Sequence, residues 1–359
     1  MDKLTKKGIG KMTRDGKIGY AVAGLGVGKT HVESALQYDK CRLVAVCDLV
    51  PSKIKDITDK NPEVIGYTDF DEMLKNTEID VISICLPSGI HAEYAVKAMN
   101  AGKHVLVEKP IDITVEAAMK IEEARKLTGK KVGCIYQNRN HAVMKPLKAA
   151  IDEGRLGKIF LGTFAVKWYR AQSYYDGETC WHGTWEMDGG GSLINQAIHT
   201  LDIMQWLMGE PESVKSTMSI NAHKIDTEDL TASILRFKNG ATATFLSTTC
   251  CYPGLSTDIQ IYGTKGAVEL DADVLKLWKI EGEDERDEED MLDRYGRGNR
   301  VACAYEEGLK YGHVTQIEDM VDAIIEDRDP QVTPVEAMKA VRIIEAIYRS
   351  AKTGETVYF

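Results

Sequence analysis

The sequence of 359 residues contains no apolar run that reaches the roughly 18 to 20 residues of a membrane-spanning helix. Residues 1–16 are basic but lack the apolar core of a signal peptide, so we expect a mobile leader on a cytoplasmic protein with no membrane partner. An excess of positive charge is also missing, because 55 acidic and 45 basic residues give a net charge of −10. Such a chain repels nucleic acids, so we expect no nucleic-acid partner, although a local basic pocket can still bind a small anion.

Paired cysteine motifs are absent as well. The 8 cysteines are scattered, with no Cys-x-x-Cys motif and no histidine at the spacing of a zinc site. We therefore expect reduced thiols in apolar strands and no metal site, with a redox role for the adjacent Cys250 and Cys251 as an open alternative. Repeats and low-complexity linkers are missing too, and the acidic run from Glu281 to Asp290 is interpreted as a solvated loop rather than a metal site.

A glycine-rich turn is the most informative feature that is present. An apolar run from Lys17 to Ala23 leads into Gly24, Gly26 and Gly28 and then into a helical pattern, which predicts a strand, a tight turn and a helix. Glycine lets the backbone turn sharply and approach a pyrophosphate, whose charge then lies at the N-terminus of the helix. Because Lys29 stands where a further glycine or alanine is usual, we expect a shortened or rearranged turn. A glycine turn without a ligand is the alternative.

The next apolar run, from Arg42 to Cys47, ends at Asp48. A carboxylate at this position accepts the two hydrogen bonds of a ribose diol and repels a 2′-phosphate. The glycine turn and Asp48 together predict NAD (or NADH), rather than NADP, as the cofactor.

Strand-like and helical segments alternate up to residue 137. We expect strands at residues 64–67, 81–86, 103–107 and 131–136, and helices at residues 51–59, 69–76, 92–101 and 115–126. Strands that alternate with helices imply right-handed crossovers and a parallel sheet covered on both faces. Residues 17–137 are therefore predicted to form a doubly wound, NAD-binding Rossmann domain of the α/β class.

The pattern changes after residue 137. A helix over residues 141–152 precedes segments of alternating polarity at residues 160–168, 214–220, 231–237, 241–247 and 258–262, and amphipathic helices follow at residues 316–326 and 335–351. Such alternation is typical of an antiparallel sheet with one packed face. We expect residues 138–359 to form an α+β domain with an open, mostly antiparallel sheet, which binds substrate and mediates oligomerisation.

Two segments carry residues with the chemistry of a catalytic site. Glu108, Lys109 and Pro110 follow the strand at residues 103–107, at the edge where open α/β sheets bind ligands. A lysine beside a nicotinamide can hydrogen-bond the oxygen being oxidised and stabilise a developing alkoxide. An exposed lysine before a proline turn is the alternative.

The second segment is a predicted helix that begins near Ser192, after three glycines, and ends at Gly209. Its Asn195, His199 and Asp202 have the i, i+4, i+7 spacing of one helix face. An imidazole titrates near neutrality and can take the hydroxyl proton as hydride leaves. A buried core histidine is the alternative reading of His199.

The glycine turn, Asp48, residues 87–91, the Glu-Lys-Pro turn and the glycine-rich helix with His199 together resemble the Gfo/Idh/MocA family, named after glucose–fructose oxidoreductase, inositol dehydrogenase and MocA. The resemblance spans nearly the whole chain and includes residues 261–269 and the closing helices. It implies a Rossmann domain followed by an open-sheet substrate domain, a tightly held nicotinamide and oxidation of a ring hydroxyl in a sugar or cyclitol. It also implies a cis peptide bond before Pro110.

The resemblance carries roles onto individual residues. Lys109 and His199 act on the reacting hydroxyl, and Asn195, which replaces the aspartate of many members, can orient the imidazole but cannot stabilise an imidazolium as an anion would. The implied cofactor-binding residues are Gly24, Gly26, Val27, Gly28, Asp48, Leu86, Pro87, Ser88, His91, Glu108, Lys109 and Gln137.

Similarity to the branch that contains UDP-N-acetylglucosaminuronate 3-dehydrogenases is carried by residues 137–139, 168–170, 174–176 and 183–185 and by the Asn195-Gln196 and Ile198-His199 pairs. Aromatic faces can stack on a pyranose and an arginine fork can hold a carboxylate or phosphate. The expected substrate-binding residues are Lys109, Arg139, Arg170, Tyr175, His182, Trp185, Asn195 and His199.

The sequence therefore predicts an NAD-dependent dehydrogenase that transfers hydride between nicotinamide and a ring carbon, C3 by expectation, of a pyranose sugar, sugar nucleotide or glycoside. Inositol oxidation and transient oxidation of a glycoside with retained NAD stay open as alternatives, and a dinucleotide sensor without chemistry is the alternative from another class. The open sheet predicts a homodimer or homotetramer.

Overall fold

The computed structural model describes residues 16–176, 181–296 and 304–359, with side chains from residue 312 onward in the last range. The predicted leader lies almost wholly outside these residues, as do Cys180 and Cys303. The chain forms two compact units. Unit 1 contains residues 1–135 and 306–338, and unit 2 contains residues 136–305 and 339–359.

Unit 1 is built around a parallel sheet of six strands in the order β3-β2-β1-β4-β5-β6. Its strands are β1 (Ile18–Ala23), β2 (Cys41–Cys47), β3 (Ile65–Tyr67), β4 (Val81–Ile84), β5 (His104–Val107) and β6 (Val132–Cys134). The chain runs outward from β1 to β3 and then returns to β4 beside β1, so the strand order reverses between β1 and β4. In such sheets ligands bind at the carboxyl ends of the strands beside this reversal.

Helices cover this sheet. They are α1 (Gly28–Gln37), α2 (Pro51–Thr58), α3 (Phe70–Leu74), α4 (His91–Asn100) and α5 (Val115–Thr128), with a 3₁₀ turn at Ser88–Ile90. Right-handed crossovers that travel in opposite directions from β1 and β4 place α1 and α4 on opposite faces. The central strands are mostly apolar, and every residue of β1 is buried, as a doubly covered parallel sheet requires.

A late segment of the chain completes this core. Helix α9 (Ala304–Ile325) contributes Ile317, Met320 and Val321 to the same apolar cluster as Val32 of α1 and Tyr20 of β1. We expected all of residues 138–359 in the second domain, and the structure differs, because residues 306–338 cluster with unit 1. The amphipathic pattern identifies the buried face of a helix but not the sheet that it covers.

Unit 2 is built around a sheet of eight strands in the order β13-β12-β11-β7-β10-β9-β8-β14. The strands are β7 (Ile159–Lys167), β8 (Pro211–Ser219), β9 (Leu230–Phe237), β10 (Thr242–Thr248), β11 (Thr257–Gly263), β12 (Gly266–Asp271), β13 (Val274–Ile280) and β14 (Val357–Tyr358). Only β7 and β10 pair in parallel, so the sheet is mixed and mostly antiparallel. The predicted fold class is confirmed, although the strand predictions missed β12 to β14.

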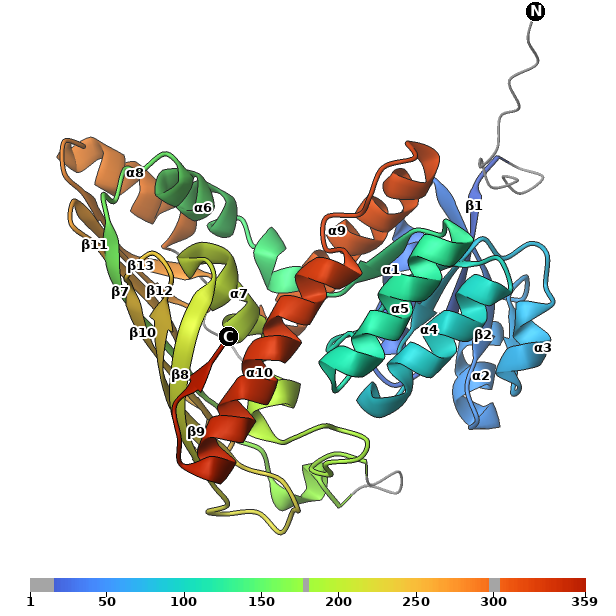
Figure 1. Cartoon of the computed structure of the whole chain (residues 1–359). Helices are drawn as coiled ribbons and strands as arrows, with labels where there is room; N and C mark the ends of the chain where they lie inside the picture. Colours follow the sequence, from blue (N-terminus) through green and yellow to red (C-terminus); the bar gives the residue numbers. More distant parts are fainter. Residues whose placement is uncertain (1–15, 177–180, 297–303) are drawn as a thin grey trace, which may run out of the picture. The chain divides into compact units, whose positions relative to one another are not determined.

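One face of this sheet carries the helices, and in Figure 1 its other face carries none of those drawn for unit 2. The helical elements are α6 (Met144–Asp152), a π-helical segment at Ser192–Ala197, α7 (Ile198–Met208), α8 (Glu285–Tyr295) and α10 (Pro334–Thr353), with 3₁₀ turns at Gln137–Asn140 and Gln172–Tyr174. Strand β9 shows the resulting alternation, since Leu235 and Phe237 are buried and Ile234 is 57% exposed.

The acidic run was predicted as a loop, and most of it is instead the first part of α8. Asp284 accepts hydrogen bonds from the backbone N–H groups of Arg286 and Asp287, and the Asp287 carboxylate accepts one from the N–H of Asp284. This capping box satisfies orphan donors at a helix start, where acidic side chains are also favoured by the helix dipole. Clustered acidic charge is therefore tolerated in a helix here.

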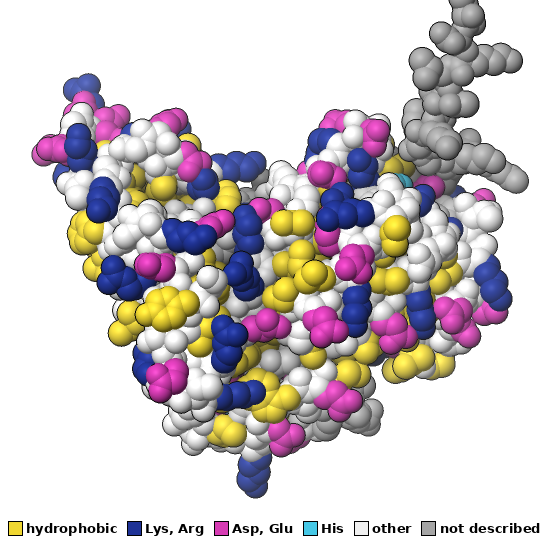
Figure 2. Space-filling view, in the orientation of Figure 1, with side chains coloured by type: hydrophobic (Ala, Val, Ile, Leu, Met, Phe, Trp, Pro, Cys, Tyr) yellow, Lys and Arg dark blue, Asp and Glu magenta, His cyan; other side chains and the backbone are white. Residues whose placement is uncertain are grey.

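No helix among the described residues combines the length and apolar character that crossing a bilayer requires. On the face drawn in Figure 2, lysine and arginine side chains are interspersed with aspartate and glutamate side chains. The six described cysteines, at positions 41, 47, 85, 134, 250 and 251, are free thiols.

Candidate active site

The glycine turn of unit 1 follows β1 directly, and its backbone explains two of the three glycines. Gly24 has φ +88°, and a Cβ added there would lie 2.2 Å from the carbonyl oxygen of Cys85. A Cβ on Gly28, the first residue of α1, would lie 2.9 Å from Cγ1 of Val22. A Cβ on Gly26 would meet nothing within 4 Å, and Gly26 and Val27 are exposed. The turn therefore presents backbone to solvent just before a helix N-terminus.

Asp48 lies at the end of β2, and its carboxylate reaches back to this turn. Oδ2 accepts a hydrogen bond of 2.7 Å from the N–H of Leu25, and Oδ1 accepts one of 2.9 Å from the N–H of Val50. Lys53 Nζ lies 3.6 Å from Oδ2. These contacts hold an anionic group beside the exposed backbone of the glycine turn.

These residues fit a bound dinucleotide. The open side of Gly26 and the start of α1 suit a pyrophosphate, and the Asp48 carboxylate suits a ribose diol. Leu86 and Pro87 are partly exposed after β4, at the same edge of the sheet. Gln137, which belongs to unit 2, has a buried side-chain oxygen with no hydrogen-bond partner among the described residues.

Replacement of Asp48 by alanine is expected to lower the ratio of kcat/KM for NAD to that for NADP by about tenfold to a hundredfold, because a hydrogen bond to a charged group contributes about 1.5–3 kcal/mol. The measurement is the ratio itself in one preparation. Damage to the turn lowers both values together, so an unchanged ratio would contradict the assignment of Asp48 to cofactor choice.

The Glu-Lys-Pro turn follows β5 at the same carboxyl edge. The peptide bond between Lys109 and Pro110 is cis, as the resemblance implied, and Lys109 is half-buried. Glu108, however, is only 4% exposed, and its carboxylate contacts the imidazoles of His31 and His313. We expected Glu108 among the cofactor-binding residues, whereas its side chain faces the interior of unit 1.

Two further residues expected at the cofactor are also internal. His91 is buried, and its ring nitrogens lie 2.7 Å from the carbonyl oxygens of Pro110 and Leu86. Ser88 is buried in the 3₁₀ turn that precedes α4. The contacts of His91 join the ends of β4 and β5 and shape the edge on which Lys109 lies.

In unit 2, the site residues centre on Asn195. Its Nδ2 donates a hydrogen bond of 2.5 Å to Asp188 Oδ1 and lies 3.1 Å from Nδ1 of His182. Its Oδ1 accepts a hydrogen bond of 2.9 Å from Gln196 Nε2 and lies 3.4 Å from the hydroxyl of Tyr174. The buried carboxylate of Asp188 therefore fixes which way the amide points.

Arg170 extends this cluster. Its guanidinium donates a hydrogen bond of 2.7 Å to Gln196 Oε1 and lies over the rings of Trp168 and Tyr174. Among the described residues, no acidic side chain forms an ion pair with it. Burial raises the pKa of Tyr174, with the charge of Asp188 acting in the same direction, so this hydroxyl is a neutral donor in the cluster.

His199 lies in the second residue of α7. Every residue from Gly190 to Gln205 is buried except His199, which is partly exposed. We expected Asn195 and His199 on one face of a regular α-helix, and the structure differs, because residues 192–197 are π-helical. The wider π-helical turn changes the angle between the side chains of Asn195 and His199. The glycines before Ser192 predict where the helix begins but not that its first turn is π-helical.

Three residues expected to bind substrate contact other side chains of unit 2. Arg139 is buried and forms two hydrogen bonds, of 2.7 and 2.6 Å, with the Asp202 carboxylate. Tyr175 is buried, with its hydroxyl 3.1 Å from Thr249 Oγ1. Trp185 packs edge-on against Tyr348 and lies under Lys352. Arginine, tyrosine and tryptophan suit the wall of a substrate pocket. Their contacts here are with residues far away in the sequence, which a local pattern does not reveal.

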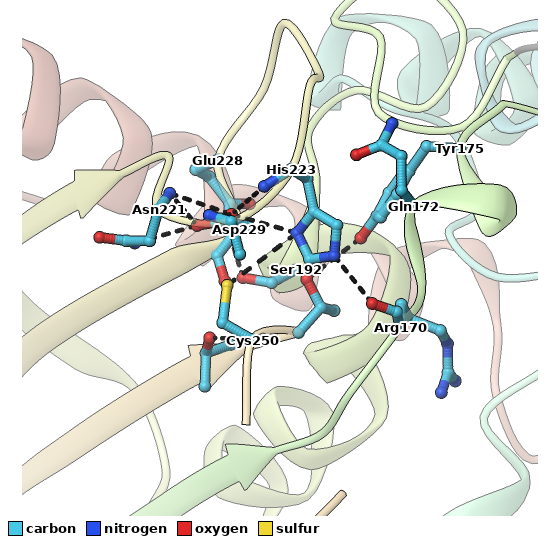
Figure 3. Close-up of polar contacts among 12 residues, drawn as sticks. Arg170, Gln172, Tyr175, Ser192, Asn221, His223, Glu228, Asp229 and Cys250 are labelled. Carbon is cyan, nitrogen blue, oxygen red and sulfur yellow. Dashed lines mark hydrogen bonds and ion pairs between the residues drawn. The ribbon is translucent and has the colours of Figure 1, made fainter. Parts of the chain in front are cut away.

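A hydrogen-bond network around the loop between β8 and β9 holds the backbone of Arg170 (Figure 3). His223 Nε2 donates a hydrogen bond of 2.8 Å to the Arg170 carbonyl, and Nδ1 lies 3.1 Å from Asp229 Oδ2. Burial opposes ionisation of Asp229, but hydrogen bonds from Ala222, Asn221 and neighbouring donors outweigh it and lower its pKa to about 2. Burial raises the pKa of the Cys250 thiol, which lies 3.9 Å from His223, to about 11. A protonated thiol and a carboxylate surrounded by donors account for this cluster without a metal ion.

Glu228, the neighbour of Asp229, holds the start of the glycine-rich segment. Its carboxylate accepts hydrogen bonds from Ser192 Oγ, from the N–H groups of Gly191 and Leu193 and from the hydroxyl of Tyr348. Burial raises its pKa, and these hydrogen bonds oppose the shift. The entry into the helix that carries His199 is thereby fixed from the loop before β9 and from helix α10.

Sequence reasoning gave no role to several residues of these clusters, namely His31, Tyr174, Asp188, Gln196, Glu228 and His313. Asp188 and Gln196 lie inside the segment that we had singled out, so the glycine-rich run was a signal for both. His313 lies in a helix that showed only an amphipathic pattern, and nothing local connects it with Glu108.

Comparison with known proteins agrees with both units. Residues 18–136 match the family model for the NAD-binding Rossmann fold of the Gfo/Idh/MocA oxidoreductases, and residues 148–359 match the model for their C-terminal alpha/beta domain. The chain is 22% identical, over 94% of its length and 97% of the relative, to myo-inositol 2-dehydrogenase of Thermotoga maritima. It is 29% identical to D-glucoside 3-dehydrogenase of Escherichia coli over 57% of each chain.

Among solved structures, the WlbA dehydrogenase of Bordetella pertussis in complex with NADH and UDP-GlcNAcA superposes with a TM-score of 0.85 at 29% identity, over 96% of this chain and 99% of that one. Both domain models match in chain order and together cover most of the residues. The chain therefore belongs to the Gfo/Idh/MocA oxidoreductase family and contains an NAD-binding Rossmann domain.

Proposed function

We propose that this protein is a dehydrogenase that transfers hydride between NAD and a ring carbon, C3, of a pyranose that carries an anionic group. The observation that carries the proposal is the set of groups at the carboxyl edge of unit 1. The exposed glycine turn, the Asp48 carboxylate and the half-buried Lys109 all follow strands of one parallel sheet. A cofactor site and a cationic group at one sheet edge suit oxidation of an alcohol.

Each proposed catalytic group has one task. The bound cofactor supplies the hydride acceptor. Lys109 donates a hydrogen bond to the reacting oxygen and stabilises the charge that develops on it. His199 takes the hydroxyl proton in the oxidising direction. Asn195, whose amide is held by Asp188, orients the imidazole of His199.

Arg170 supports an anionic substrate. A guanidinium stacked on two aromatic rings and bonded to a neutral amide keeps donors for a carboxylate or phosphate. His182 stacks on Tyr174 with ring centroids 4.5 Å apart and extends the same aromatic wall. The WlbA structure, whose ligand is UDP-GlcNAcA, shows that a relative of this fold binds such a sugar nucleotide.

The experiment is a panel of UDP-sugars, UDP-sugar uronates, simple glycosides and inositols, followed by the absorbance of NADH. We expect turnover of the uronates, and Arg170→Met is expected to raise their KM by at least tenfold, since a charged hydrogen bond contributes about 1.5–3 kcal/mol. Arg294→Met, on the exposed side of α8, is the matched control and should leave KM unchanged. Turnover of neutral glycosides alone, with no effect of Arg170→Met, would contradict the anionic substrate.

Inositol oxidation is the second candidate, because the match to myo-inositol 2-dehydrogenase covers almost the full length of both chains. The same panel decides between the two. NADH formation with inositols and none with sugars would favour the cyclitol. Product that appears without any net NADH would favour transient oxidation with retained cofactor.

We also propose that the helix-free face of the eight-stranded sheet joins copies of the chain into a homodimer or homotetramer. Ile234 lies in register with Thr244, Thr163 and Gln260 on neighbouring strands, so this row shares the exposed side of Ile234. A sheet face without helices that exposes an apolar side chain such as Ile234 suits burial against a second copy. The mass of the particle in solution, by light scattering, tests the assembly. Cytoplasmic location stays a prediction.

A further inference from the structure

A buried carboxylate, that of Glu108, is the centre of a polar network inside unit 1. Its Oε1 lies 2.9 Å from Nε2 of His31 and 3.1 Å from Nε2 of His313. Its Oε2 accepts a hydrogen bond of 2.9 Å from the backbone N–H of Lys109. Both histidines are at most 1% exposed. Three donors from α1, α9 and the turn after β5 thus converge on one carboxylate.

Counting hydrogens assigns the protonation state of this network. A carboxylate only accepts, so each imidazole donates its Nε2–H to Oε1. His31 Nδ1 then accepts from the Ser83 hydroxyl, 2.9 Å away, and Ser83 in turn accepts from the Tyr20 hydroxyl at 2.5 Å. Every one of these contacts is satisfied with neutral His31, neutral Tyr20 and ionised Glu108.

The pKa shifts agree with that assignment. Burial favours the protonated form of Glu108, but the hydrogen bonds from His31 and His313 outweigh it and hold its pKa well below the usual range. Burial lowers the pKa of His31 and raises that of Tyr20. Within this network, therefore, Glu108 is ionised and His31 and Tyr20 are neutral.

The network joins two parts of the proposed cofactor and substrate edge. His31 lies in the first turn of α1, directly after the glycine turn, and Glu108 precedes Lys109. On the other side of Lys109, the Pro110 carbonyl is bonded by His91. The backbone of the Glu-Lys-Pro turn is thus held from both ends, one of them tied to α1.

We propose that His31, Glu108 and His313 form a positioning unit that fixes the backbone of Lys109 relative to the start of α1. The proposal rests on the proposed role of Lys109, because these side chains act through it and none of them touches the reacting atoms. A displacement of about 1 Å in a reacting group can cost about a hundredfold in rate, so such a clamp has a measurable effect.

The same three side chains offer ligand atoms close enough to hold a metal ion. The hydrogen count favours the clamp, because a metal ion would need both Nε2 atoms free of protons, and those protons are the donors that satisfy the carboxylate. A chelator therefore distinguishes the two. We expect activity to be unchanged after treatment with 1,10-phenanthroline, and a loss that zinc restores would overturn the proposal.

The main experiment compares His313→Leu with His313→Gln. Leucine removes the donor to Glu108, and we expect kcat to fall about tenfold to a hundredfold while the dissociation constant of NADH changes less than threefold. Glutamine places an amide N–H near the position of Nε2 and should restore most of kcat. His104→Leu is the matched control, because His104 is a buried histidine at the other end of β5, with Nδ1 accepting from the N–H of Lys131. Its kcat should stay that of the wild type.

A second variant guards against misfolding of His313→Leu. Glu108→Gln keeps the shape and an acceptor for both histidines but turns an amide N–H₂ toward the N–H of Lys109, and the same fall in kcat is expected. Wild-type kcat in both variants would overturn the clamp. If Lys109→Ala is inactive in that case, only the clamp fails, whereas full activity of Lys109→Ala removes the proposed function itself.

Discussion

Replacement of Lys109 by alanine is expected to lower kcat about a hundredfold to a thousandfold, the usual cost of removing one donor to a charge that develops in the transition state. Lys109 follows β5 at the edge shared by the glycine turn and Asp48, and it is half-buried. The cost appears in kcat because the donor matters most when the alcohol oxygen carries charge. The dissociation constant of NADH should change by less than threefold, since the glycine turn and Asp48 stay intact.

A lysine elsewhere on unit 1 provides the control. Lys120 lies on α5 and is exposed, with an ion pair to Glu116 four residues earlier, so Lys120→Ala should have the kcat of the wild type. Lys109→Arg keeps the positive charge but presents a planar, larger donor group, and we expect it to recover only a small part of the lost rate. Wild-type kcat in Lys109→Ala, with normal NADH binding, would remove Lys109 from the chemistry.

Much of unit 1 could be predicted because its signals are local. Apolar runs that alternate with helices specify a doubly covered parallel sheet, and the carboxyl ends of its strands meet at one edge whatever the lengths of the loops. The glycine turn, Asp48 and Lys109 each follow a strand directly, so naming the strands also placed these residues at one edge.

Contacts between distant segments could not be predicted in this way. His313 is 205 residues away from Glu108, and no periodic pattern in α9 indicates that its histidine meets a carboxylate. Arg139 and Asp202 form their pair across 63 residues. Sequence patterns report burial of apolar side chains, whereas the partner of a buried polar side chain depends on the packing of whole elements.

Asn195 shows how a local deduction can be correct in chemistry and incomplete in structure. An amide cannot stabilise an imidazolium as a carboxylate does, and the sequence has no carboxylate at position 195. Folding brings the Asp188 carboxylate to within 2.5 Å of the Asn195 amide nitrogen. The carboxylate that many family members carry at position 195 is thus replaced by an amide that is hydrogen-bonded to the carboxylate of Asp188.

Replacement of His199 by asparagine is expected to lower kcat for alcohol oxidation about a hundredfold to ten-thousandfold, the range for removal of a general base. Position 199 is the partly exposed point of an otherwise buried segment from Gly190 to Gln205, so the substitution changes a group that a ligand can reach and leaves the packing of α7 in place. Thermal unfolding should therefore stay close to that of the wild type.

The pH dependence separates a base from a merely structural histidine. In the oxidising direction the base must be neutral to take the proton, so the kcat of the wild type is expected to fall at acidic pH, and His199→Asn should lose this limb. Loss of the base slows the chemical step, so a substrate deuterated at the oxidised carbon should show a larger isotope effect on the kcat of the variant than on that of the wild type. His141→Asn, which changes another histidine of unit 2 whose pKa is lowered by burial, is the control and should keep the wild-type pH profile. If His199→Asn retains the acid limb and the wild-type isotope effect, another group takes the proton, and the cluster around Asp188 becomes the place to look for it.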